Sequence, residues 1–306
     1  MVVHAYDLCS YEDGCMTPAT SRSAKKARSS GLETRRRHVA DLLDGVRPAT
    51  ARAVLGTALL GAEQPELPVA NLVAVASLFG ISSGAARTSL WRMVVDGDLI
   101  SEGATYALAG RLLERRQRVD TASRNDHTPG GWDGTWEVVI VALDRRRAMD
   151  RLELRKAASA LHLAELREGV WTRPDNLDPD REPSARAVVD QQCVLYKGAK
   201  SNISPDAVGE RFDLQPWATT ARRLLDAMHG EIAAAPYDGE DIGATLSHQF
   251  TLSIAVVAHL ERDPLLPADL LPDDWPAEGL RTTYRQFDEL FQRTMNRAML
   301  REPQRR

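Results

Sequence analysis

Residues 67–108 read LPVANLVAVASLFGISSGAARTSLWRMVVDGDLISEGATYAL, and they hold the most informative pattern in the chain. Pro68 suits the first turn of a helix, and apolar residues recur at helical spacing from Val69 to Phe79. Gly80 then provides a stop signal. This pattern predicts a helix whose apolar side faces a core.

A second helix is expected after a short turn. Ile81 would fill the core in the turn, and Ser82 or Ser83 can accept a hydrogen bond from the first free amides. No Asp or Glu occurs from 81 to 95, although the chain as a whole has a net charge of −4. A surface that faces phosphates requires such a local excess of positive charge. A helical wheel puts Ala86, Leu90, Met93 and Val94 inside, Gly84, Thr88, Arg92 and Val95 outside, and Arg87 on the flank.

A hairpin is expected directly after this helix, which Gly97 closes. Residues 98–101 and 105–108 predict two strands around a tip at 102–104. Helix, turn, helix and hairpin in this order are typical of a winged helix-turn-helix, which places its second helix in the DNA major groove. The predicted DNA contacts are therefore Ser82, Ser83, Arg87, Thr88, Arg92 and Thr105.

The same pattern has a plainer interpretation. Two helices with apolar periodicity also occur in helical proteins that bind no nucleic acid. Gly84 weakens a helix by about 1 kcal/mol relative to alanine. Glu102 stands at the hairpin tip, where a minor-groove contact would favour Arg or Lys. Arg87 could instead form a surface ion pair, and Trp91 could cover the hairpin.

Four segments resemble the PaaX family of bacterial transcriptional regulators. In chain order they are GISSGAARTSLWRMVVDGDLI from Gly80, WDGTW from Trp132, GVWTRP from Gly169 and DPLLPADLLPDDWP from Asp263. The resemblance extends from about Arg47 to the helix after the fourth segment and therefore covers most of the chain.

The resemblance implies a regulator that binds an operator as a dimer. The founding members repress phenylacetate catabolism and leave DNA when they bind an aryl-acetyl-CoA thioester, whereas other relatives regulate different pathways. This chain departs from the family at Ser83 and Gly84, where members often carry charged residues, and in its short acidic hairpin. These departures leave the operator sequence open.

The composition agrees with a cytoplasmic regulator. With 306 residues, 43% hydrophobic and 27% charged, the chain can form two or three domains with real cores. No membrane span or signal peptide is visible. The three cysteines, Cys9, Cys15 and Cys193, match no disulfide framework or metal spacing and are expected to be reduced. The seven histidines form no helical pair, so we expect no metal or cofactor.

The N-terminal part divides into a tail and a domain. Residues 1–46 are expected to be a disordered basic tail, because Arg22 to Arg37 hold seven Lys or Arg against Glu33. The tail could follow DNA phosphates, be merely solvated, or come from an upstream start codon. Residues 47–122 are the predicted DNA-binding domain, which a helix over 50–61 opens and a basic helix over 111–119 closes.

A polar linker at 123–131 separates this domain from an expected ferredoxin-like α/β sandwich over 131–203. The patterns predict strands at 136–143, 166–173 and 188–196, with helices at 145–161 and 206–212. Asp144, at the end of the first strand, allows an alternative, since the fold resembles the core of CRISPR-associated spacer-acquisition nucleases. An Asp after a strand usually caps a turn, however, and no second acid supports catalysis here.

Residues 204–306 are expected to form a helical C-terminal domain with helices at 217–234, 241–262 and 280–300. The Pro-rich segment at 263–276 should pin the last two together. Arg173, Trp217 and Arg222 are candidate contacts for an acyl-CoA effector, because Arg binds phosphates and Trp stacks on adenine.

The whole prediction is an α+β protein with three domains: a winged helix-turn-helix, a ferredoxin-like middle domain and a helical C-terminal domain. Its expected function is that of a homodimeric repressor that binds double-stranded operator DNA and is released by a small-molecule effector. The alternatives are a DNA-binding protein without an effector and a metal-dependent nuclease that uses Asp144.

Overall fold

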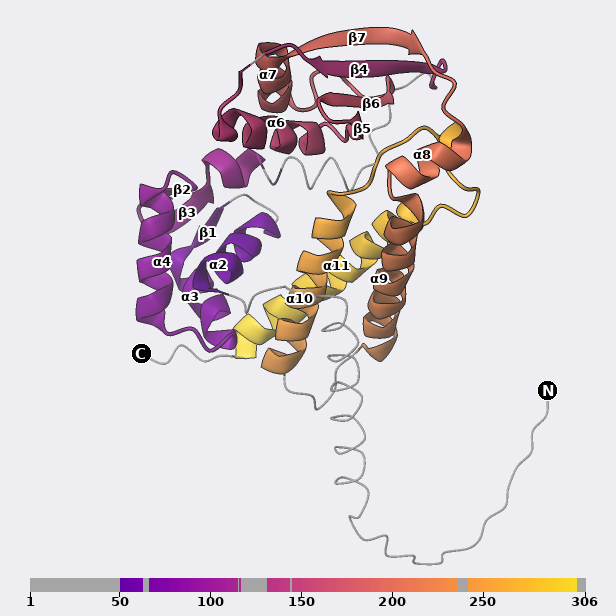
Figure 1. Ribbon diagram of the computed structural model, residues 1–306. Helices are drawn as coiled ribbons and strands as arrows, with labels where there is room; N and C mark the ends of the chain where they lie inside the picture. The colour runs from indigo at the N-terminus through magenta and orange to yellow at the C-terminus, as the bar shows by residue number, and fades with distance from the viewer. Residues whose placement is uncertain are drawn as a thin grey trace, which may run out of the picture.

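The computed structural model describes residues 50–62, 66–114, 116, 131–143, 145–235 and 242–301 (Figure 1). It combines helices with two antiparallel sheets, so the predicted α+β class is confirmed. The predictions for the basic tail at 1–46, for the linker at 123–130 and for Asp144 lie outside the described residues.

The N-terminal unit holds three helices and a small sheet. The helices are α2 (Ala51–Leu60), α3 (Val69–Leu78) and α4 (Ser83–Val95), and they confirm the predicted helices. The sheet has the order β1-β3-β2, with β1 (Glu66–Pro68), β2 (Leu99–Glu102) and β3 (Thr105–Leu108). The strand β1 was not predicted, and Pro68 ends it and caps α3 instead of lying in the first turn of the helix.

The middle unit is a four-stranded antiparallel sheet with two helices. Its elements follow in the order β4 (Thr135–Val141), α6 (Ala148–Ala160), β5 (Ala164–Arg167), β6 (Val170–Pro174), α7 (Pro183–Gln192) and β7 (Cys193–Lys200). The strands lie in the order β5-β6-β4-β7. Both helices pack on the same side of the sheet, and Figure 1 shows α6 below the strands and α7 beside the end of β4 and β7.

Two strand predictions in this unit are wrong in detail. The single strand expected at 166–173 is a hairpin, in which β5 and β6 pair on either side of Gly169. The strand expected at 188–196 begins inside α7, because Pro183 opens a helix that buries Ala185, Val189 and Gln192 on one side. The helical pattern therefore outweighed the strand preference of the valines at 188 and 189.

The C-terminal unit is helical. It contains α8 (Pro205–Arg211), α9 (Leu214–Ala234), α10 (Ile242–Leu260), a 3-10 turn (Ala268–Leu270) and α11 (Ala277–Arg301). The helix expected over 206–212 in the middle unit belongs here as α8, because α7 supplies the second helix of the sheet and α8 contacts α9. The Pro-rich segment packs on these helices, since Leu266 is fully buried and the ring of Trp275 stacks on that of Trp217 with centroids 4.6 Å apart.

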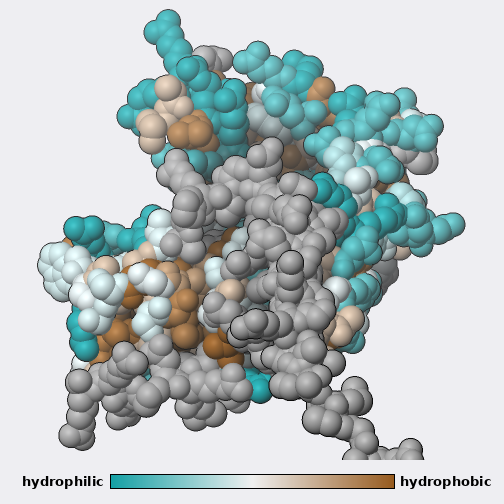
Figure 2. Space-filling model, turned by 90° about the horizontal axis from the view of Figure 1, so that it is seen from below, coloured by the Kyte–Doolittle hydropathy of each residue, from teal (hydrophilic) through white to brown (hydrophobic). Residues whose placement is uncertain are grey.

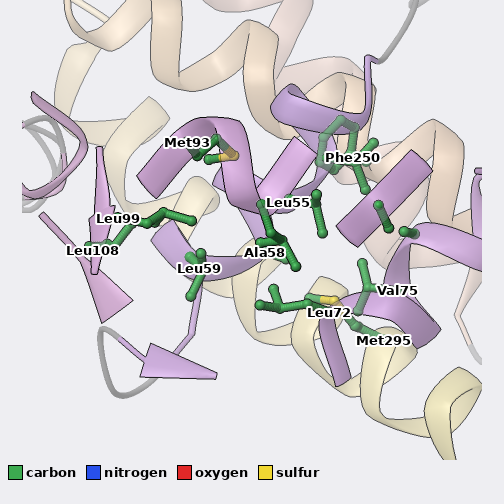
Figure 3. Close-up of a cluster of buried hydrophobic side chains, with 14 of the residues drawn as sticks. Leu55, Ala58, Leu59, Leu72, Val75, Met93, Leu99, Leu108, Phe250 and Met295 are labelled. Atoms are coloured by element: carbon green, nitrogen blue, oxygen red, sulfur yellow. The ribbon is translucent and has the colours of Figure 1, made fainter. Parts of the chain in front are cut away.

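The hydrophobic core of the N-terminal unit is shared with the C-terminal helices. Leu55, Leu72 and Met93 come from α2, α3 and α4 and lie in one cluster with Phe250 of α10 and Met295 of α11 (Figure 3). Both α10 and α11 contact α3. The support of α3 therefore depends on Phe250 and Met295, which lie 178 and 223 positions after Leu72 in the chain.

The surface is of mixed polarity. On the face seen in Figure 2, hydrophilic residues predominate along the outer margin, and apolar residues gather further in. Within the described ranges, no helix is both long and apolar enough to cross a membrane.

Candidate nucleic-acid interface

Helix α4 is held by one side and exposes the other. Ala86, Leu90 and Met93 are fully buried in the core of the N-terminal unit. The helix begins with a side-chain cap, in which Ser82 Oγ accepts a hydrogen bond from Ala85 N at 3.3 Å. The predicted helix start and inward side are both confirmed.

The outward side of α4 carries the predicted polar and cationic residues. Ser83, Gly84, Arg87, Thr88 and Arg92 are all exposed, and α4 contains no acidic residue. Among the described residues, no carboxylate forms an ion pair with the guanidinium of Arg87 or Arg92. Five of the six candidate DNA contacts thus lie on one helix or its cap.

A tight turn sets α4 against α3. Gly80 has a φ of +71°, which glycine adopts without strain, and its N–H donates to the carbonyl of Ser77 at 2.9 Å. The N–H of Ile81 donates to the carbonyl of Ala76 at 3.1 Å, and the Ile81 side chain is half-buried against the core. The turn is therefore both hydrogen-bonded and packed.

Asp98, just after α4, forms ion pairs with Arg52 of α2 and with Arg111 after the hairpin. This aspartate is almost fully buried, and its Oδ1 lies 3.2 Å from Nε of Arg111. Arg52 also pairs with Asp96 at 2.6 Å, and this pairing raises its pKa. These two arginines therefore hold α4 in place, whereas Arg87 and Arg92 face outward.

The hairpin packs beside the start of α3. The N–H of Val69 donates to the carbonyl of Ala104 at the hairpin tip at 2.8 Å. Thr105, the sixth candidate DNA contact, is half-buried on the central strand β3, opposite Glu102 on β2 and Pro68 on β1. The structure therefore places Thr105 beside the hairpin tip, on β3 and not on α4.

Three exposed apolar residues in this region are not among the predicted DNA contacts, although Val95 was expected on the outward side of the helix. Trp91 and Val95 of α4 are 63% and 64% exposed, and Ile100 of β2 is also exposed. The interpretation of Trp91 as a cover for the hairpin does not fit this exposure. The signal was present in the sequence, because Trp91 lies three and four positions after Thr88 and Arg87 on the same side of the helix.

The three candidate effector contacts do not come together. Arg173 on β6 is fully buried, and its Nη1 donates to the carbonyl of Leu161 at 2.9 Å while its Nη2 donates to Asn176 Oδ1 at 2.9 Å and the carbonyl of Leu265 at 3.2 Å. Trp217 and Arg222 lie on a different element, α9. The role of these residues in effector binding stays a prediction.

Trp217 and Arg222 contact the Pro-rich segment and the end of α10. The indole N–H of Trp217 donates to the carbonyl of His259 at 3.2 Å, and burial lowers the pKa of His259. Arg222 pairs with Asp274 at 2.6 Å at the edge of an open hollow of about 790 Å³, which also contains several acidic side chains.

No group of three or more potential metal ligands occurs among the residues that the structure describes. Asp144, which would carry the nuclease alternative, is outside them.

Comparisons with known proteins point to one family. Residues 50–112 match the family model described as PaaX-like protein, and residues 129–205 match the model described as PaaX protein central Cas2-like domain. A solved structure of an uncharacterized protein, Rv0674 from Mycobacterium tuberculosis, is similar with 36% sequence identity and a TM-score of 0.62. The similarity covers 82% of this chain and 99% of that one. No curated protein matches the chain.

Proposed function

This chain belongs to the PaaX-like family. From this membership we propose that it is a sequence-specific DNA-binding transcriptional regulator and that it acts as a repressor. The observation that carries the proposal is the outward side of α4, where Arg87, Thr88 and Arg92 are exposed and no carboxylate is present. A helix that enters the major groove needs this combination of cations and small polar side chains.

Two fold assignments support this function. We assign the N-terminal unit to the winged helix-turn-helix class, because α3, a short turn, α4 and the β2–β3 hairpin follow in that order and β1 completes the sheet. We assign the middle unit to the ferredoxin-like class, because its β-α-β-β-α-β order and its strand order β5-β6-β4-β7 match that topology.

In the proposed mechanism two copies of the chain bind one operator. Each α4 would contact one half-site, and the half-sites would lie about one helical turn of DNA apart. Arg87 and Thr88 are the proposed base contacts, Ser82, Ser83 and Arg92 the proposed contacts near phosphates, and Thr105 the proposed contact from the hairpin.

A cytoplasmic location and a small-molecule effector complete the proposal. The effector, which the family resemblance suggests to be an acyl-CoA type of molecule, would bind one arrangement of the units better than another. The bound arrangement would no longer match the two half-sites, so the operator would be released.

The test is a gel shift on the DNA upstream of the gene, with unrelated DNA as competitor. We expect a specific complex, and Arg87→Ala should weaken it by about 1 to 3 kcal/mol, which is a factor of about 5 to 150 in Kd, without changing the unfolding curve. The matched control is Arg223→Ala, an exposed arginine on α9. A complex no stronger than that with competitor DNA would refute the function, and an equal loss on unrelated DNA would assign Arg87 to phosphate alone.

A further inference from the structure

A hollow of about 560 Å³ lies between the middle and C-terminal units. Its walls come from the end of α6, from the segment before α7 and from the end of α10 with the residues that follow it. Sites for small molecules commonly have this size and often lie between domains. None of the three candidate effector contacts predicted from the sequence lines this hollow.

The hollow combines cationic and apolar side chains. Lys156 and Arg181 come from the middle unit and Arg262 from the C-terminal unit, while Ala160, Ala258 and Leu260 provide apolar wall. Glu182 and Glu261 also line it, so cations outnumber carboxylates by three to two before the buried guanidinium of Arg173 is considered.

The floor of the hollow is held in an uncommon backbone conformation. His162 and Leu265 line it, and their φ values are +52° and +51°, which residues other than glycine rarely adopt. Arg173 donates to the carbonyls of both residues, at 3.4 Å and 3.2 Å. Such strain often occurs at functional sites, where the surrounding structure maintains it.

Two further groups stabilise the Leu265 end of this floor. Asn176 Nδ2 donates to the Leu265 carbonyl at 2.9 Å, and the Leu265 N–H donates to Asp263 Oδ1 at 3.1 Å. Asp263 is itself buried in an ion pair with Arg281 of α11. The floor is thus fixed by residues of both units and is preorganised before any ligand binds.

The pKa of His162 reflects both its burial and the cations beside it. Burial, followed by the positive charges of Arg173 and Arg181, lowers the pKa of its imidazole to about 3. The ring is therefore neutral at physiological pH. Burial, the larger cause, disfavours a charge of either sign, whereas the positive charges of Arg173 and Arg181 disfavour a cation and favour an anion.

Helix α10 links the hollow to the N-terminal unit. Ala258 and Leu260 at its C-terminal end line the hollow, whereas Leu246 and Phe250 nearer its start lie in the core that supports α3 and α4 (Figure 3). The ring centroids of Phe250 and of Phe79, which ends α3, are 4.9 Å apart. A continuous helix of 19 residues thus touches both places.

We propose that this hollow is the site for a small amphipathic organic anion, whose charged head lies near Lys156, Arg181 and Arg262 and whose apolar part lies along Ala160, Ala258 and Leu260. Occupation of the site shifts α10 and, through Phe250, changes the position of α3 and α4. This inference rests on the proposed function, because it names the site through which an effector acts on operator binding.

Calorimetric titration of the full chain with hexanoate, hexyl phosphate and 1-hexanol tests the site, since the three probes share an apolar body. We expect an anion to bind at least tenfold more tightly than the alcohol, and the stronger of the two anions identifies a carboxylate or a phosphate head. Equal binding of all three probes, or no binding of either anion at millimolar concentration, overturns the proposal.

Variants locate the binding. Lys156→Gln and Arg181→Gln should each weaken the anion about tenfold, and Ser159→Trp, at an exposed position that lines the hollow, should abolish binding by filling it. The matched control is Arg155→Gln, because this residue adjoins Lys156 on α6 and is exposed but does not line the hollow. A loss in the control equal to that in Lys156→Gln overturns the location.

Operator binding with and without the stronger anion then tests the coupling. We expect the operator Kd to change at least fivefold in the original chain and less than twofold in Ser159→Trp. Binding of the anion without any change in operator affinity overturns the coupling and leaves the proposed function intact. Absence of a specific operator complex refutes the proposed function, while calorimetry still decides whether the hollow binds the anion.

Discussion

The arginines of α4 and the arginine of β6 show two opposite uses of one side chain. Arg87 and Arg92 extend from an exposed helix face. Arg173 is fully buried, and every hydrogen bond that it donates goes to a neutral carbonyl or amide oxygen, such as those of Leu161 and Asn176. Burial lowers the pKa of Arg173 to about 9, which still leaves its guanidinium charged at neutral pH.

This difference separates a binding role from a structural one. An exposed guanidinium keeps its hydration until a partner replaces the water, so it contributes little to folding and can contribute to binding. A buried guanidinium has lost that water, so its removal leaves several buried carbonyls without a donor. Charge alone therefore does not identify a binding arginine, and four measurements can break or sharpen the contrast.

The largest expected effect is on folding and comes from Arg173→Ala. We expect the free energy of unfolding to fall by about 3 to 5 kcal/mol, because the variant removes the Arg173 donor from the carbonyls of Leu161 and Pro174 and one of the two donors to the carbonyl of Leu265. Urea denaturation followed by circular dichroism measures it. Arg155→Ala on the exposed side of α6 is the control and should change the value by less than about 0.5 kcal/mol.

Asp98→Ala should have an intermediate effect. The variant removes a buried acceptor from Arg52 and Arg111, and we expect a loss of about 2 kcal/mol in the free energy of unfolding. Asp96→Ala is the matched control, since Asp96 pairs with Arg52 at an exposed position and should cost less than about 1 kcal/mol. Equal losses would mean that the burial of Asp98 is irrelevant to the support of α4.

The pH dependence of stability should report His162. Its pKa is lowered in the folded state, so between about pH 3 and 6.5 the unfolded chain binds a proton that the folded chain does not. Stability is therefore fully present above pH 6.5 and is lost as the pH falls. The original chain should lose about 1 to 2 kcal/mol more than His162→Asn between pH 7 and pH 5.

The comparison with His162→Asn isolates one group. Asparagine tolerates the positive φ at this position, and His259, whose pKa burial also lowers, is present in both proteins. Unfolding curves at the two pH values give the difference. If the two proteins lose stability equally, the neutral state of His162 contributes nothing to folding.

The smallest expected effect on folding comes from Trp91→Ala. Because this side chain is 63% exposed on the same helix as Arg87, we expect the free energy of unfolding to change by less than about 0.5 kcal/mol. Thermal or urea unfolding measures this change. The contrasting variant is Leu90→Ala, because Leu90 is the buried neighbour and its loss should cost about 2 to 5 kcal/mol. A loss above 1 kcal/mol in Trp91→Ala would show that Trp91 stabilises the fold despite its exposure.

Local patterns predicted the elements that depend on near neighbours. The two helices and the hairpin of the N-terminal unit follow from apolar spacing, a serine cap and glycine stops, all within a few residues of the element that they define. Local pattern does not predict the strand β1, because three residues show no periodicity and its pairing partner, β3, lies about forty residues away.

The middle unit shows where such patterns conflict. The valines at 188 and 189 have high strand preference, yet they lie in α7, since the helix that Pro183 opens buries a continuous side against α6 and the sheet. A short apolar run cannot distinguish a buried strand from a buried helix by its composition.

The sequence by itself determined which residues form most of the helices and strands and which side of α4 is apolar, because these properties depend on spacing along the chain. Only the tertiary structure decided that Phe250 and Met295 complete the core beneath α3, that Arg173 is structural, and that Lys156 and Arg262 meet across a hollow. These relations join residues far apart in the chain, and burial and charge at such contacts depend on packing rather than on local pattern.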